Sequence, residues 1–87
     1  MGMNVRISDH AKDHMRDCSI AEQDVRDLFD GKIPVVKAEQ SKEYEDCIEI
    51  LAVLSGQYCK IVYSCVTNAV TTAFKLRDNQ WKKLTEK

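Results

Sequence analysis

Residues 44–76, YEDCIEILAVLSGQYCKIVYSCVTNAVTTAFKL, decide the fold of this chain. The stretch contains three apolar, β-branched segments: Tyr44 to Leu54, Tyr58 to Val66 and Ala69 to Leu76. Only the short turns Ser55-Gly56-Gln57 and Thr67-Asn68 separate these segments. Closely spaced strands with short turns pair antiparallel, as a meander. The stretch therefore predicts three neighbouring antiparallel strands.

Side-chain alternation along these strands predicts which residues share a face of the sheet. In the middle strand, one face holds Tyr58, Lys60, Val62, Ser64 and Val66, and the other holds Cys59, Ile61, Tyr63 and Cys65. In the last strand, strict alternation puts Val70, Thr72, Phe74 and Leu76 on one face and Ala69, Thr71, Ala73 and Lys75 on the other. Both faces are largely apolar at the centre. One face can hold helices, so the other must meet the tail, a partner or a ligand.

Two short helices are expected before the strands. Ser8 can cap a helix over Asp9 to Asp17. Ser19-Ile20-Ala21-Glu22 has the S-x-x-E form of a capping box and opens a second helix, with Gly31 where a C-terminal glycine belongs. The sequence therefore predicts an α+β domain with two N-terminal helices before the sheet.

A fourth strand is expected between the helices and the meander. Ile33 to Ala38 is short and β-branched, and Pro34 near its start suits an edge strand. The predicted sheet is thus four-stranded and antiparallel. Asp78 to Lys87 is expected to be either a short helix carrying Trp81 and Leu84 back onto the sheet or a frayed basic tail.

Length and composition favour a single intracellular domain. The 87 residues fit one domain spanning 1–87, and 44% hydrophobic with 31% charged residues suits a globular chain. The N-terminus MGMNVRISDH has no apolar signal-peptide core, and IEILAVL is too short to span a membrane. We therefore expect a cytoplasmic protein without membrane contact.

The charge of the chain is unevenly distributed. Residues 1–50 hold seven Lys/Arg and twelve Asp/Glu, for a net charge of −5, whereas residues 51–87 hold six and two, for +4. A nucleic-acid ligand should therefore meet the second half of the chain. The total of −1 argues against strong non-specific binding of nucleic acid and makes docking on a protein partner more plausible.

The four cysteines, Cys18, Cys47, Cys59 and Cys65, are expected to be ordinary half-buried thiols. They contain no C-x-x-C pair of the kind that zinc ribbons use. A zinc site assembled from these cysteines with His10 or His14 is the alternative; the expected function itself requires no cofactor.

Residues 10–20, HAKDHMRDCSI, resemble the opening motif H-A-x-x-R-M-x-x-R-x-I of a family of short bacterial and phage domains of unknown function. That family continues with a K/R-hydrophobic-V-Y strand and a T-hydrophobic-aromatic step, which would be 60–63 and 72–74 here. It is grouped with the RelE/ParE-like (BECR) ribonuclease toxins. Two positions depart from the motif, because His14 and Cys18 stand where the family has arginine.

The resemblance implies a metal-independent RNA endonuclease of toxin type. His10 and His14 would divide the general acid and base roles, because imidazole titrates near neutral pH. Lys60 would stabilise the charge that develops on the phosphorus centre, and Thr72 would orient the scissile phosphate. Tyr63 and Lys75 are the expected substrate-binding residues, with Tyr63 stacking on or hydrogen-bonding a nucleotide.

The alternative function belongs to another class. The same scaffold could act as a non-catalytic protein-binding module, such as an inhibitor from a phage or mobile element. The acidic first half and the two missing arginines favour this alternative, whereas the paired histidines and the basic second half favour the nuclease. Expected partners are RNA, a protein such as an antitoxin or an inhibited target, and a second copy of the chain. The second copy would pack on the remaining apolar face of the sheet.

Overall fold

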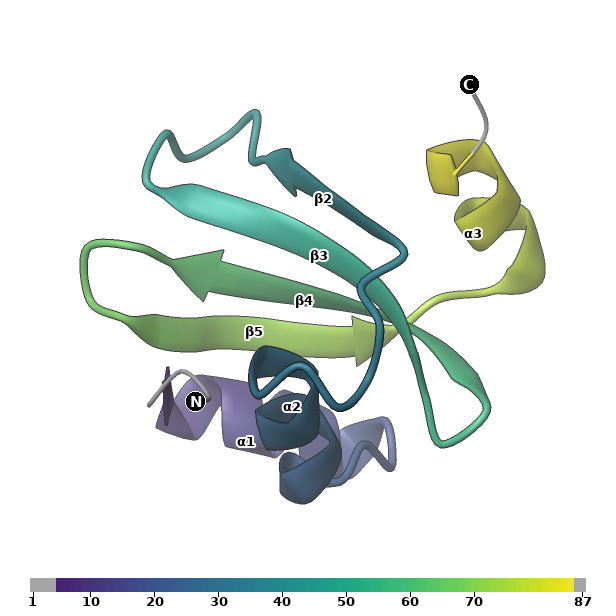
Figure 1. The fold of residues 1–87 in the computed structure, drawn as a ribbon, viewed down its shortest axis with the longest axis horizontal. Helices are drawn as coiled ribbons and strands as arrows, with labels where there is room; N and C mark the ends of the chain where they lie inside the picture. The colour runs from purple at the N-terminus through teal and green to yellow at the C-terminus, as the bar shows by residue number, and fades with distance from the viewer. Residues whose placement is uncertain (1–4, 86–87) are drawn as a thin grey trace.

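The computed structural model describes residues 5–85, which form an α+β fold around one five-stranded mixed sheet (Figure 1). The elements in chain order are β1 (Arg6–Ile7), α1 (Asp9–Asp17), α2 (Glu22–Phe29), β2 (Lys37–Gln40), β3 (Cys47–Leu54), β4 (Gln57–Ser64), β5 (Ala69–Lys75) and α3 (Asp78–Thr85). The order across the sheet is β1-β5-β4-β3-β2. The predicted meander is thus confirmed as β3, β4 and β5, which pair antiparallel.

The first predicted helix has the expected bounds and the expected cap. The Ser8 side chain accepts a hydrogen bond from the Ala11 backbone N–H at 3.1 Å. The Ser8 hydroxyl also donates to the Thr71 backbone oxygen at 3.3 Å. One side chain therefore starts α1 and fixes that start against β5.

The second predicted helix forms, but without the predicted capping box. Ala21 is the N-cap residue of α2 and makes no side-chain capping hydrogen bond. Ser19 instead has a positive φ of 58° in the tight turn between the helices, where its backbone N–H donates to Arg16. At the other end Gly31 has a φ of 85°, and the next residue, Lys32, donates its N–H to the Asp27 carbonyl. This arrangement is a Schellman turn, and it confirms the predicted position of Gly31 at the end of the helix.

The four predicted strands form as β2 to β5 and pair antiparallel, but the predicted strand count was wrong because the sheet has five strands. β1 is an additional strand that pairs parallel with β5, through Arg6 with Ala69 and Ile7 with Val70. A two-residue strand carries no alternation, so nothing in the sequence indicates it. The predicted edge strand begins four residues later than expected, at Lys37.

A β-bulge changes the predicted faces of β5. The register between β4 and β5 shifts at Val62/Tyr63, so that Val62 pairs with Thr72 and Tyr63 with Val70. Thr71 is the extra residue, and its hydroxyl donates to the Val62 carbonyl at 3.3 Å. Val70 and Ala73 consequently share one buried face, although strict alternation separates them.

The core lies between the sheet and the layer formed by α1 and α2 (Figure 1). Ala11 and Met15 of α1 and Val25 and Leu28 of α2 are buried there. The sheet contributes Ile50, Ala52, Leu54, Cys59, Ile61, Tyr63, Val70 and Ala73. We call this side of the sheet the helix face and the opposite side the open face.

The last segment is a helix, α3, which stands apart from α1 and α2 (Figure 1). The Trp81 ring stacks on Tyr58 with centroids 4.6 Å apart, and the Lys37 ammonium donates to the Leu84 carbonyl at 2.8 Å. α3 therefore covers one end of the open face, beside the buried Leu51. Within residues 5–85 no helix has the length and apolarity needed to cross a membrane.

Candidate functional site

The part of the open face that α3 leaves uncovered is a hollow of about 570 Å³. We call it the open-face hollow. The side chains that matter for its chemistry are His10, Glu49, Lys60, Thr71, Thr72 and Phe74. Its volume lies in the range of ordinary small-ligand pockets, so it can hold a nucleotide-sized group.

An ion pair lines the hollow. Lys60 Nζ lies 2.8 Å from Glu49 Oε1, and the two side chains are only 19% and 29% exposed. The same ammonium lies 5.7 Å from the centroid of the Phe74 ring. These groups meet because of the strand register. Lys60 of β4 pairs with Phe74 of β5, and Glu49 of β3 pairs with Val62, two residues after Lys60 on β4. The lysine is thus held in place by a carboxylate and an aromatic ring.

The bulge in β5 brings two neighbouring threonines to the hollow. Because Thr71 is the extra residue, it and Thr72 both line the hollow. The hydroxyl of Thr71 is bonded to the Val62 carbonyl. Two consecutive strand residues normally point to opposite faces, so this pair of hydroxyls depends on the irregularity.

The start of α1 brings His10 to the hollow. Ser8 fixes the beginning of α1 to the Thr71 carbonyl, and His10 follows two residues later. His14 lies one turn further along, with its ring centroid 4.4 Å from that of His10. Both rings are solvent-exposed, but only His10 lines the hollow.

The structure therefore brings together three of the residues that the resemblance implicates and separates three others. His10, Lys60 and Thr72 share the hollow. Tyr63 is buried on the helix face, where its ring lies 5.3 Å from Phe29 and its hydroxyl donates to Asn68 Oδ1 at 2.5 Å.

Lys75 is exposed at the end of β5 and pairs with Cys59, a helix-face residue. Lys75, like His14 and Tyr63, is not part of the hollow's lining. An exposed lysine on the helix side of the sheet has no direct access to a ligand held on the open face.

Glu49, Thr71 and Phe74 are site residues that the sequence reasoning did not select. Glu49 is the one charged residue within CIEILAVL, and a charge in the middle of an apolar strand is a usable signal. Thr71 could not be found in this way, because strict alternation assigns it to the helix face.

The hollow carries more negative than positive charge. Glu43 and Asp46, from the turn before β3, line it together with Glu49. Among the described residues of its lining, Lys60 is the one lysine and none is an arginine. The hollow therefore combines charged groups with apolar side chains such as Val62 and Phe74, and the packing of a second copy on this face stays a prediction.

The cysteines lie in four different surroundings. Cys59 is buried in the core, Cys47 is buried on the open face, Cys18 is half-buried and Cys65 is exposed, and all four are free thiols. Burial raises the pKa of the Cys59 thiol and, together with the nearby Asp46 carboxylate, that of Cys47. Among residues 5–85, no three His, Cys, Asp or Glu side chains are grouped as metal ligands.

Comparisons of this chain with known protein families, with curated proteins and with solved structures found no match.

Proposed function

We propose that this chain is a metal-independent RNA endonuclease of the RelE/ParE-like toxin type, acts in the bacterial cytoplasm and uses the open-face hollow as its site. One observation carries the proposal. His10, Lys60 and Thr72 come from α1, β4 and β5, and they line the same hollow. The resemblance of residues 10–20, 60–63 and 72–74 to the family pattern singled out these residues independently of their positions in space.

The hollow contains the groups that metal-free RNA cleavage requires. A base removes the proton of the 2′-hydroxyl, the 2′-oxygen attacks phosphorus, and an acid protonates the departing 5′-oxygen. His10 would transfer one proton, and Glu49, the carboxylate held beside Lys60, would transfer the other. Glu49 takes the role first considered for His14, because Glu49 lines the hollow and His14 does not.

Lys60 and the threonines complete the proposed site. The Lys60 ammonium would stabilise the charge on the phosphorane oxygens, in a partly buried setting where such charge interactions are stronger than in water. The Thr72 hydroxyl would hold the phosphate, and the exposed face of Phe74 or Tyr44 would accept a stacked base.

A protein-binding module is the second candidate, and the carboxylates of the hollow favour it. Glu43, Asp46 and Glu49 outnumber Lys60, and a surface of that sign attracts basic groups more readily than a phosphate backbone. A basic segment of an antitoxin or of an inhibited target protein fits this charge.

Induced expression in bacteria distinguishes the two candidates. We expect the wild-type chain to arrest growth and fragment cellular RNA, and Lys60→Ala to do neither. Lys75→Ala is the matched control, because it removes a lysine from the next strand but outside the hollow. RNA that stays intact with all three chains would reject the nuclease. Binding of a basic peptide by the wild-type chain but not by Glu49→Gln would then support the protein-binding module.

A further inference from the structure

β2 is an open edge of the sheet. It pairs with β3 on one side, and on its other side no strand within residues 5–85 covers it. Val35 and Val36, directly before it, are 48% and 51% exposed. An edge strand presents unpaired backbone N–H and C=O groups to which another strand can bond.

The hydrogen-bonding pattern shows which residues of β2 point outward. The Ser41 N–H donates to the Cys47 carbonyl at 2.8 Å, toward β3. Because alternate residues of an antiparallel strand turn their backbone groups to the same side, Lys37 and Glu39 also bond toward β3. Ala38 and Gln40 therefore direct their N–H and C=O groups away from the sheet.

We propose that β2 pairs antiparallel with β2 of a second copy of this chain, about a two-fold axis at Ala38. In that register the two Ala38 residues exchange both backbone hydrogen bonds, and Lys37 stands opposite the partner's Glu39. Lys37 and Glu39 already form an ion pair within one chain, at 2.9 Å on one face. The two-fold axis then creates a square of four alternating charges, an interface patch complementary to itself.

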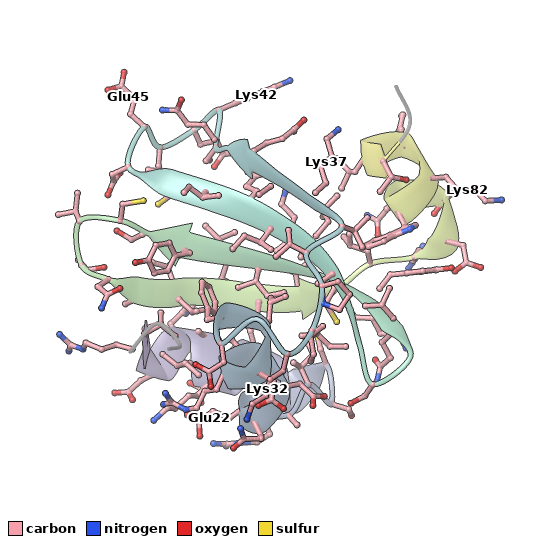
Figure 2. The ribbon with its side chains drawn as sticks, viewed as in Figure 1. Glu22, Lys32, Lys37, Lys42, Glu45 and Lys82 are labelled. Carbon is pink, nitrogen blue, oxygen red and sulfur yellow. The ribbon has the colours of Figure 1, made fainter. Side chains whose placement is uncertain are left out.

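A second charge complementarity supports the same register. α3 lies at the Lys37 end of β2 and carries Lys82 and Lys83, whereas the turn after Gln40 carries Glu43, Glu45 and Asp46. Figure 2 shows Lys82 and Glu45 at opposite ends of the molecule, with Lys37 between them. Rotation about an axis at Ala38 exchanges these ends, so the acidic turn of each copy approaches the basic α3 of the other.

The pairing would place two hollows on one surface. A two-fold axis between antiparallel strands is perpendicular to the sheet, so both open faces look to the same side. The proposal does not depend on the proposed function, because it rests on the edge and its charges alone.

Charge reversal tests the register. Sedimentation equilibrium between about 1 μM and about 1 mM should show a monomer–dimer equilibrium for the wild-type chain. Lys37→Glu and Glu39→Lys should each weaken dimerisation at least about tenfold, because both cross-strand pairs become repulsive. An equimolar mixture of the two variants should dimerise again, since the acidic β2 of one variant then faces the basic β2 of the other. Circular dichroism confirms that both variants fold.

Three results would overturn the proposal. A wild-type chain that stays monomeric up to the highest concentration would show that the charged side chains protect this edge from pairing. Dimers that form equally well in wild type and in both single variants would place the interface elsewhere on the molecule. A mixture no more dimeric than its separate components would reject the register.

Discussion

Lys60 Nζ lies 2.8 Å from Glu49 Oε1 in a hollow on the open face of the sheet, so the cation proposed to meet RNA is already paired with a carboxylate. A phosphate that approaches Lys60 must compete with Glu49 for the ammonium. Lys60 is expected to bind the phosphate, and Glu49 is expected to transfer a proton. Variants of the two residues therefore test phosphate affinity and proton transfer separately.

Glu49→Gln should separate binding from cleavage. The change removes one negative charge and one proton acceptor and keeps the shape of the side chain. We expect cleavage of RNA to fall by about 10²- to 10⁴-fold, the usual contribution of a general acid or base, while RNA affinity stays the same or rises. Single-turnover cleavage and filter binding measure the two quantities. Unchanged cleavage in this variant would remove Glu49 from the proton-transfer role.

The two histidines should behave differently when each is replaced by glutamine. His10→Gln should abolish most of the cleavage, because His10 lines the hollow. His14→Gln should retain cleavage within a few-fold of wild type, because its exposed ring lies outside that lining. Initial rates on the same RNA provide the comparison. Equal losses in the two variants would mean that the histidine pair acts as one unit.

How far the sequence predicts this fold depends on whether each element has a regular period. The three long strands alternate over many residues, so their pairing follows from the pattern, and the first helix has a true cap at Ser8. The bulge at Thr71 interrupts the alternation of β5. β1 has only two residues and therefore shows no alternation. The S-x-x-E pattern at Ser19 failed because the tight turn between the helices leaves Ala21 as the N-cap.

The candidate site could be predicted only in part for a similar reason. The resemblance of residues 10–20, 60–63 and 72–74 selected His10, Lys60 and Thr72, and the fold places these in one hollow. It also selected Tyr63, which alternation assigns to the face that became the core. The neighbours of Lys60 depend on how the strands are aligned with one another, and the sequence of one strand does not give this alignment. The ion pair of Lys60 with Glu49 is therefore seen only in the structure.

Ser8→Ala should destabilise the fold by about 0.5–2 kcal/mol, the usual effect of losing an N-cap side chain. Ser8 accepts from the Ala11 N–H and also donates to the Thr71 carbonyl. Ser19→Ala is the matched control and should change stability by less than about 0.5 kcal/mol, because Ser19 does not cap α2. Urea denaturation followed by circular dichroism gives both values. Similar losses in the two variants would argue against the cap at Ser8 as the cause.

Cys59 should make the fold less stable in alkaline solution. Burial raises the pKa of its thiol above the ordinary value of 9.0, so the unfolded chain releases this proton at a lower pH than the folded chain does. The folded state then binds more protons than the unfolded state, and its free energy of unfolding falls as the pH rises through and above that value. Denaturation at several pH values between about 8 and about 10 should show a shallower decline in Cys59→Ala than in wild type. Parallel curves would mean that other groups cause the decline.

The most direct test of the proposed nuclease is the cleavage of purified, end-labelled RNA in the presence of EDTA. We expect the wild-type chain to cut this RNA and leave 2′,3′-cyclic phosphate ends, because attack by the 2′-oxygen forms that ring. Lys60→Ala should not cut, and an RNA with a single 2′-deoxy substitution at the cleaved position should stay intact there. Full cleavage by Lys60→Ala, or cleavage at the 2′-deoxy position, would contradict the account, as would the absence of any cleavage by the wild-type chain.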